Sequence, residues 1–177
     1  KIIPFRGEYL KFRQGYEEFV NHLIYPVPDD NFPFLGVHFT RMIDGSREVG
    51  PNAVLALKRD GYNWNSFSFK DAFESLTYSG LIRFVTNNLI FSINEFRSSL
   101  FLRDFIAKAK KMIPDIDDFM LERGTAGVRA QALSPKGELQ MDFNVIKTDR
   151  QIHVLNAPSP GATASLSIAD YIIQTYL

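Results

Sequence analysis

Residues 153–168 have the sequence HVLNAPSPGATASLSI, in which a short apolar segment, a turn and the start of a helical pattern follow one another. We expect Ile152–Leu155 to form a buried strand and Ala162–Tyr176 to form an amphipathic helix. Ser159 is suited to the N-cap position and Pro160 to the first helical position. Because backbone N–H groups and the helix dipole favour negative charge at a helix N-terminus, the turn predicts an anion-binding site. An ordinary strand–turn–helix connection explains the same residues equally well.

The composition predicts a globular chain with no preference for nucleic acid. Its 177 residues are 45% hydrophobic and 14% aromatic, which is enough for a sizeable core. The 20 basic and 20 acidic residues cancel, so nothing in the charge favours nucleic acid as a partner. The absence of Cys excludes disulfides, Cys-ligated zinc and a thiol nucleophile. No apolar run approaches the roughly 18 residues of a membrane span and no signal peptide is visible, so we expect a cytoplasmic location.

The first third of the chain has the pattern of an antiparallel sheet. Its segments are rich in β-branched and aromatic residues, and some of them alternate in polarity. An Asp-Gly pair at residues 44–45 is a strong hairpin signal. The expected strands are Ile2–Phe12, interrupted at Gly7, Leu23–Val27, Gly36–Ile43 and Glu48–Leu57, broken at Gly50-Pro51, with a turn at Asp29–Phe32.

The middle of the chain has helical signals. Capping-box patterns at Ser68 and Ser92 predict helix starts, while Gly80 and Pro114 predict helix ends. The expected helices are Lys70–Ser79, Leu81–Phe91 and a third one from Ser92 to Pro114 with a single apolar stripe.

The last third adds strands and the closing helix. The expected strands are Val128–Leu133, Phe143–Thr148 and Ile152–Leu155. Strands before and after a helical middle predict an α+β fold, in which helices pack on an antiparallel or mixed sheet.

Several stretches resemble the L-2-hydroxyglutarate oxidase/dehydrogenase family, which are flavoproteins of the D-amino-acid-oxidase-like superfamily. The matching stretches are PFRGEYL (4–10), NHLIYPVP (21–28), LGVHFT (35–40), EVGPNAVLA (48–56), AGVRAQAL (126–133) and NAPSPGATASLSI (156–168). This resemblance implies an FAD-dependent oxidoreductase that oxidises the small 2-hydroxy acid L-2-hydroxyglutarate to 2-oxoglutarate. It also implies oxygen or a quinone as electron acceptor, with peripheral membrane association of the full-length enzyme as an option.

The same resemblance implies two domains. Residues 1–123 would form the substrate-binding domain, and residues 124–177 would supply the C-terminal strands and helix of an FAD-binding α/β domain. None of the 11 Gly residues lie two positions apart, so the G-x-G-x-x-G segment with which the family holds FAD is absent. We therefore expect the chain to be the C-terminal part of a longer enzyme, and to be inactive in isolation.

Arg129 is the first candidate for a role in the chemistry. It lies between two Ala residues in an apolar strand, where a charge is costly unless it is paired. Its partner is either a structural carboxylate or the carboxylate of a substrate, which a guanidinium binds in bidentate fashion. The resemblance favours the substrate, because residues 127–129 match the superfamily's G-x-R motif.

His38 is the second candidate. The hydroxyl of a 2-hydroxy acid loses a proton as the acid is oxidised, and a base with a pKa near the operating pH assists this step. A mid-strand His suits that role, and a hydrogen-bonded core His is the alternative. A metal site is not predicted, because the three His residues show no ligand spacing.

The turn of the opening stretch supplies the predicted cofactor contacts. By the resemblance, the residues that approach the flavin are Asn156, Ser159, Gly161, Ala162 and Thr163. A helix N-terminus at this place would stabilise the negative charge of reduced flavin.

Arg6 and Glu8 lie on one strand face and are expected to form a surface ion pair worth under about 1 kcal/mol. An enzyme with the same groups could instead oxidise another 2-hydroxy or 2-amino acid. The isolated chain could also be a non-catalytic binding domain, an alternative that the missing glycine motif favours.

Overall fold

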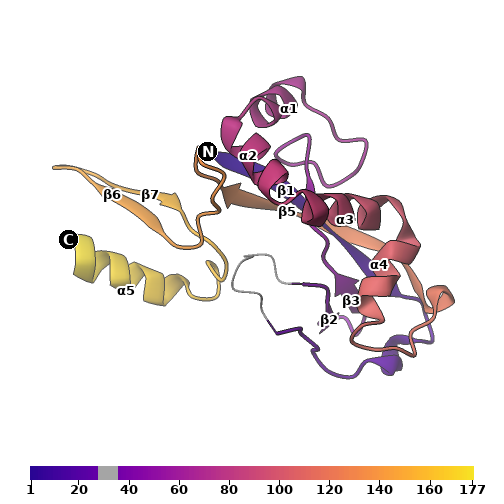
Figure 1. Ribbon diagram of the computed structural model, residues 1–177. Helices are drawn as coiled ribbons and strands as arrows, with labels where there is room; N and C mark the ends of the chain where they lie inside the picture. The colour runs from indigo at the N-terminus through magenta and orange to yellow at the C-terminus, as the bar shows by residue number, and fades with distance from the viewer. Residues whose placement is uncertain (28–35) are drawn as a thin grey trace.

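The computed structural model describes residues 1–27 and 36–177 (Figure 1). The turn predicted at Asp29–Phe32 lies outside the described residues. In chain order the strands, helices and short 3-10 helices (η) are β1 (Ile2–Phe12), η1 (Glu17–Phe19), β2 (His38–Arg41), β3 (Arg47–Gly50), β4 (Val54–Leu55), α1 (Phe69–Leu76), α2 (Ser79–Asn87), α3 (Leu89–Leu100), α4 (Leu102–Ala109), η2 (Asp118–Met120), β5 (Leu121–Ala132), β6 (Asn144–Lys147), β7 (Ile152–Asn156) and α5 (Ser165–Tyr176). Strands precede and follow a helical middle, so the predicted α+β fold is confirmed.

The larger sheet is built on β1. Along one edge β1 pairs antiparallel with β5, from Ile2 opposite Ala132 to Phe12 opposite Leu121. Along the other edge it pairs with β3 and, nearer its N-terminus, with β4. β2 pairs with β3 and completes a five-stranded antiparallel sheet. Most side chains of β1 are buried, because helices and loops pack on the faces of the sheet.

The hairpin predicted at residues 44–45 is confirmed, since β2 and β3 pair antiparallel across this turn. The strand predicted at Leu23–Val27 is wrong. Within it only Ile24 pairs, through an isolated bridge to Phe39. Pro26 has no N–H to donate, which opposes extension of the pairing through that position.

Two apolar clusters hold the helices against the sheet. The first joins β1, β2 and β3 to α4. Its fully buried members include Leu10, Phe12, Phe39, Val49, Phe105 and Ile106. The second joins β1 to α2, where the rings of Phe5 and Phe84 meet edge to face with centroids 6.2 Å apart. Each fully buried side chain of this size stabilises the fold by roughly 1.5–3 kcal/mol relative to an exposed one.

The N-cap predicted at Ser68 is confirmed, and the helix end predicted at Gly80 is wrong. The Ser68 hydroxyl accepts a hydrogen bond of 3.3 Å from the Asp71 N–H at the start of α1. α1 ends at Leu76, and Gly80 lies in the first turn of α2. The missing side chain matters for packing there, because a Cβ on Gly80 would overlap the carbonyl oxygen of Ser134.

Replacing Gly80 with Ala is expected to lower the free energy of unfolding by about 1–3 kcal/mol, since overpacking forces the surrounding atoms to move. Besides the Ser134 carbonyl, the added Cβ would meet the Tyr78 ring at 2.5 Å. Gly127→Ala is the matched control, because no heavy atom lies within 4 Å of its Cβ position. Chemical denaturation measures both variants, and equal midpoints would contradict the close contact at Gly80.

The single helix predicted from Ser92 to Pro114 is wrong, because the chain forms α3 and α4 with a break at Phe101. Phe101 is extended (φ −108°, ψ 111°), and Ser92 lies inside α3 rather than at a cap. The break allows Phe105 of α4 to enter the first apolar cluster. Packing thus overrides a continuous apolar stripe. The helix predicted at Leu81–Phe91 is likewise divided between α2 and α3.

The C-terminal helix starts later than predicted. α5 begins at Ser165, so the N-cap predicted at Ser159 and the first helical position predicted at Pro160 are wrong. Its N-cap residue, Ala164, has no capping side chain. The preceding residues form turns, in which the Ala164 N–H donates to the Pro160 carbonyl at 3.1 Å. The backbone N–H groups at the start of α5, which have no partner within the helix, therefore follow the turn in which an anion-binding site was predicted.

The strand β7 was expected to be buried, and this prediction is wrong. Val154 and Leu155 are 43% and 51% exposed. β7 pairs with β6 in a separate two-stranded sheet. This hairpin and α5 lie to one side of the molecule, away from α1–α4 (Figure 1). A two-stranded sheet has little surface against which to bury its side chains.

The predicted boundary between residues 1–123 and 124–177 falls inside a strand. β5 continues through Arg123–Thr125 and pairs with β1 on both sides of that position. The boundary does not coincide with a loop, and the division into two domains stays a prediction.

Candidate functional site

Arg129 lies on β5, at the edge of the larger sheet, directly opposite Phe5 of β1. Its side chain is partly buried. Among residues 1–27 and 36–177, no hydrogen bond or ion pair reaches its guanidinium. The sequence left open a structural carboxylate as the partner of Arg129, and none of these described residues provides one. The guanidinium is available to an external anion, for which it offers a bidentate fork.

A wide cavity of about 560 Å³ borders Arg129, and we call it the arginine cavity. It is lined by Arg129, Ala130, Gln131, Gln140, Met141 and residues 156–160. The structure therefore brings together three of the predicted site residues: Arg129, Asn156 and Ser159. Gly161, Ala162 and Thr163 do not line this cavity and belong to the turns that precede α5. Their predicted contact with the cofactor stays a prediction.

Asn156 helps to shape the arginine cavity. It is 7% exposed, and its amide donates to the carbonyl oxygens of Asp142 at 2.9 Å and Gln140 at 3.4 Å. These bonds join the end of β7 to the segment that precedes β6. The Asn156 amide hydrogens are thereby engaged within the protein, and the small residues that follow it form one wall of the cavity.

His38 begins β2 and is 8% exposed. Its Nδ1 lies 2.9 Å from the carbonyl oxygen of Gly36, and its ring stacks on that of Tyr25 with centroids 4.5 Å apart and planes at 16°. A carbonyl oxygen only accepts, so Nδ1 must donate in this bond. In the neutral ring Nε2 is therefore the basic nitrogen.

The surroundings of His38 keep its imidazole neutral near pH 7. Burial, the largest effect, lowers its pKa from the usual 6.5, and the nearby positive charge of Arg129 lowers it further. The hydrogen bond to the Gly36 carbonyl raises the pKa; this effect is smaller than that of burial and larger than that of Arg129. A neutral His with a free Nε2 can accept a proton, and a structural His would have the same properties.

The Pro51–Ala53 loop between β3 and β4 also borders Arg129, across a small cavity of about 50 Å³. Two carboxylates hold this loop. Glu8 accepts hydrogen bonds from the Asn52 side chain at 2.8 Å and from the Ser99 hydroxyl. Glu95 accepts from the Ala53 N–H at 2.9 Å. Glu8 thereby links β1 to the Pro51–Ala53 loop, and Glu95 links α3 to the same loop, which forms one wall of the cavity.

Arg6 and Glu8 form a buried ion pair, so the surface pair expected from the sequence is wrong. Their side chains are 4% and 11% exposed, and Arg6 Nη2 lies 2.9 Å from Glu8 Oε1. The Arg6 guanidinium also sits 4.5 Å from the centre of the Trp64 ring. Trp64 and Ser99 are distant in sequence, and no spacing signal on β1 indicates that they cover it.

The role of Glu95 is not predicted by its sequence pattern. Glu95 lies three residues after Ser92 and so belongs to the capping-box pattern at Ser92, but its carboxylate pairs with Lys108 Nζ at 2.6 Å. Only the folding of α4 against α3 brings these two charges together.

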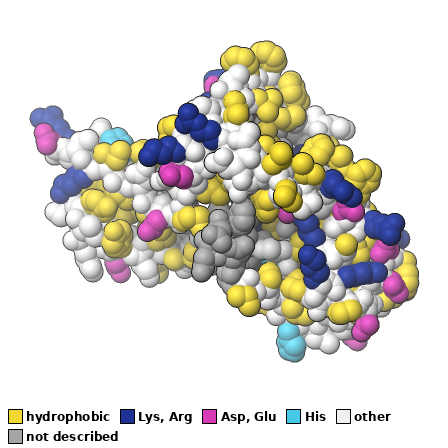
Figure 2. All heavy atoms as spheres, in the orientation of Figure 1, with side chains coloured by type: hydrophobic (Ala, Val, Ile, Leu, Met, Phe, Trp, Pro, Cys, Tyr) yellow, Lys and Arg dark blue, Asp and Glu magenta, His cyan; other side chains and the backbone are white. Residues whose placement is uncertain are grey.

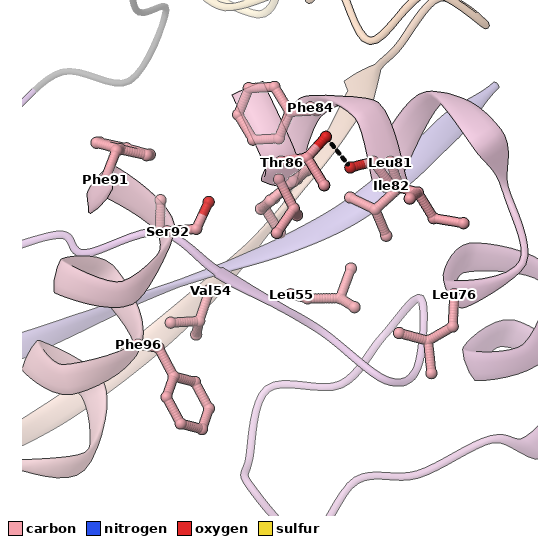
Figure 3. Close-up of a pocket in the computed structure, with 13 residues that line it drawn as sticks. Val54, Leu55, Leu76, Leu81, Ile82, Phe84, Thr86, Phe91, Ser92 and Phe96 are labelled. Carbon is pink, nitrogen blue, oxygen red and sulfur yellow. Dashed lines mark hydrogen bonds between the residues drawn. The ribbon is translucent and has the colours of Figure 1, made fainter. Parts of the chain in front are cut away.

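A separate apolar cavity of about 350 Å³ lies between β4 and the helices α2 and α3. Leu55, Leu81 and Phe96 are among the residues that line it (Figure 3). Its Thr86 hydroxyl donates to the Ile82 carbonyl at 3.0 Å, so this polar group is already engaged. None of the predicted site residues lines this cavity. Without a charged group, it does not suit a dicarboxylic acid.

The described part of the chain contains no group of three or more His, Asp or Glu residues that could hold a metal ion. The candidate site is centred on Arg129, whose guanidinium borders the arginine cavity. His38 does not line this cavity and, within the described residues, is connected to Arg129 only through the electrostatic effect on its pKa. These features define an α+β domain with an arginine that can bind a small carboxylate.

Comparison with known proteins finds relatives that share one name. No family model matches the chain. L-2-hydroxyglutarate dehydrogenase of Escherichia coli (strain K12) is 49% identical over 173 residues, which is 98% of this chain and 41% of that protein. The mitochondrial L-2-hydroxyglutarate dehydrogenase of Mus musculus is 45% identical over 179 residues, which is 98% of this chain and 39% of that protein.

The chain fits a fragment of the L-2-hydroxyglutarate dehydrogenase family, and the resemblance seen in the sequence is confirmed. A third relative, the L-2-hydroxyglutarate dehydrogenase of Indibacter alkaliphilus, is 48% identical over 174 residues, covering 98% of this chain and 44% of that protein. The chain spans about 40% of the length of the curated relatives it matches.

Proposed function

We propose that this chain supplies the substrate side of an FAD-dependent oxidoreductase that converts L-2-hydroxyglutarate to 2-oxoglutarate. The main support is Arg129, a partly buried guanidinium that borders the arginine cavity and has no partner among the described residues. The names of the relatives, at 45–49% identity, support the same substrate.

In this proposal each residue acts on a different part of the substrate. Arg129 holds a carboxylate through two parallel hydrogen bonds and fixes the orientation of the 2-carbon. Nε2 of His38 accepts the proton of the 2-hydroxyl, while the hydrogen on that carbon leaves as a hydride. Loss of the proton and the hydride converts the alcohol to the 2-oxo group.

FAD, when bound, supplies the acceptor for the hydride. The chain's residues fit one wall of a flavin site. Asn156 and Ser159 line the arginine cavity, and the segment from residue 157 to 163 contains only Ala, Pro, Ser, Gly and Thr. Such small side chains leave room for a planar ring. Gly161, Ala162 and Thr163 continue this wall toward α5 in the proposal.

Flavin absorption of the complete enzyme tests this function. We expect visible flavin bands that bleach when L-2-hydroxyglutarate is added without an electron acceptor. If the bands bleach only with another 2-hydroxy or 2-amino acid, that acid is the substrate instead. An enzyme without flavin would contradict the proposal. Residues 1–177 alone are expected to be inactive and to retain no stoichiometric flavin, since their sequence lacks the G-x-G-x-x-G motif.

The electron acceptor in this proposal is oxygen or a quinone. Reoxidation of the substrate-reduced enzyme in aerated buffer, with and without a soluble quinone analogue, separates the two. The cytoplasmic location expected from the sequence stays a prediction.

We also propose peripheral membrane association of the complete enzyme. In the described residues no helix is long and apolar enough to cross a membrane. Large apolar side chains are nevertheless exposed on α1–α3, among them Phe69 at 76% and Ile90 at 78%, and Figure 2 shows apolar side chains gathered in this region. Cosedimentation with phospholipid vesicles should weaken in a Phe69→Ser/Ile90→Ser variant. If the parent does not cosediment, or if the variant cosediments as well as the parent, this surface is not the membrane contact.

A further inference from the structure

We propose that Tyr25 is a positioning residue for His38, and that its stacked ring holds the imidazole so that Nε2 is the proton-accepting atom. The proposal rests on the proposed function, because it describes how the base of that reaction is held. It assigns a role to a residue that is not among the site residues predicted from the sequence.

The stack follows from the register of an isolated bridge. Ile24 and Phe39 exchange two backbone hydrogen bonds, of 3.1 and 2.8 Å. In antiparallel pairing, the next pair along is Tyr25 with His38. Residues beside a doubly bonded pair form a non-bonded pair, in which the side chains approach most closely. The observed ring separation of 4.5 Å agrees with this geometry.

Two contacts fix the imidazole in different directions. The Tyr25 ring is nearly parallel to it, with 16° between the planes, and prevents tilting. The bond of 2.9 Å from Nδ1 to the Gly36 carbonyl prevents rotation within the plane. Together they fix the ring orientation and the tautomer of His38, as second contacts to a functional His commonly do.

At this position Tyr25 contributes little to the hydrophobic core. It is 47% exposed, whereas His38 beneath it is 8% exposed. A partly exposed ring contributes less to the hydrophobic core than a buried one. Its largest effect is therefore on His38, which it shields from water on one face.

The charges around His38 in the described residues are few. Arg129 on β5 acts on it electrostatically, Gly50 lies opposite it on β3, and Tyr25 is the titratable group stacked on it. Removing the Tyr25 ring would expose His38 to water, so the pKa of His38 should rise toward its usual value.

The test compares Tyr25→Leu with Tyr25→Phe in the complete enzyme. Leu removes the stack, and flavin reduction by L-2-hydroxyglutarate should slow by about 10- to 100-fold, as expected for a misplaced reacting group. The acid limb of the pH–rate profile should also move to higher pH. Phe keeps the stack, and its rate and profile should stay within about twofold of the parent. Flavin content and thermal midpoint are measured on both variants, and Tyr25→Met replaces Tyr25→Leu if that variant does not fold.

Each other outcome overturns the proposal in a recognisable way. If Tyr25→Leu keeps the parent rate and pH profile while His38→Asn loses the titrating group, the positioning role is wrong and the base assignment stands. Equal losses in the Leu and Phe variants would assign the effect to the Tyr25 hydroxyl and overturn the stack. If His38→Asn keeps the titrating group, the base assignment of the proposed function fails, and Tyr25 has no base to position.

Discussion

Arg129→Lys in the complete enzyme is expected to lower kcat/KM for L-2-hydroxyglutarate by about 30- to 4,000-fold, which corresponds to roughly 2–5 kcal/mol of transition-state binding. Lys keeps the positive charge and loses the planar fork, so the carboxylate is held by one bond instead of two. Bound flavin should remain, because the guanidinium forms no hydrogen bond or ion pair that holds the described part of the chain together.

Arg123→Lys is the matched control for this prediction. Arg123 lies on the same strand, and its guanidinium donates to the carbonyl oxygens of Ser99 and Leu100 at 3.2–3.3 Å. It does not line the arginine cavity, so kcat/KM should stay within about twofold of the parent. If Arg129→Lys is folded, flavin-loaded and nearly as active as the parent, the carboxylate role must be abandoned. Joint loss of folding, flavin and activity would assign Arg129 a structural role.

The features predicted correctly from the sequence are those that depend on neighbouring residues. The hairpin at residues 44–45 needs only an Asp-Gly pair between two alternating segments, and the cap at Ser68 needs only a hydroxyl three residues before a free N–H. β1 needs only a run of strand-forming residues. In each case the local preference agrees with the global fold, which is the usual condition for a reliable prediction.

The wrong predictions concern residues whose structure depends on distant contacts. The apolar stripe from Ser92 to Pro114 is consistent with one helix, and packing of Phe105 against the sheet divides it at Phe101. Burial is equally non-local. The Arg6–Glu8 pair is buried by contacts from Trp64 and from Ser99, and no pattern within β1 encodes those contacts.

The candidate site was predicted only in part for the same reason. Arg129 stands out in the sequence because a charge is unusual between apolar neighbours. The contact between His38 and Tyr25 depends on a single bridge across the segment that separates them, and that bridge has no sequence signal. The late start of α5 at Ser165 moved Gly161, Ala162 and Thr163 out of the predicted helix N-terminus.

His38→Asn in the complete enzyme is expected to slow flavin reduction by roughly 100-fold or more. Asn can still form a hydrogen bond and cannot accept the substrate proton. In the parent enzyme the rate should fall as the pH drops and His38 becomes protonated. Because burial and Arg129 lower the pKa of His38, this decline should occur below pH 6.5, the usual value for His. The Asn variant should lose this acid limb.

Stopped-flow measurement of flavin reduction across the pH range tests this assignment, and His22→Asn is the control. His22 is exposed and lines none of the cavities around Arg129, so its replacement should change neither the rate nor the pH profile. An unchanged acid limb in His38→Asn would move the base to another residue, and Tyr9 of β1 is the next candidate. A decline centred above pH 6.5 in the parent would show that the imidazole environment differs from the buried, arginine-facing one described here, since only a raised pKa of His38 gives that direction.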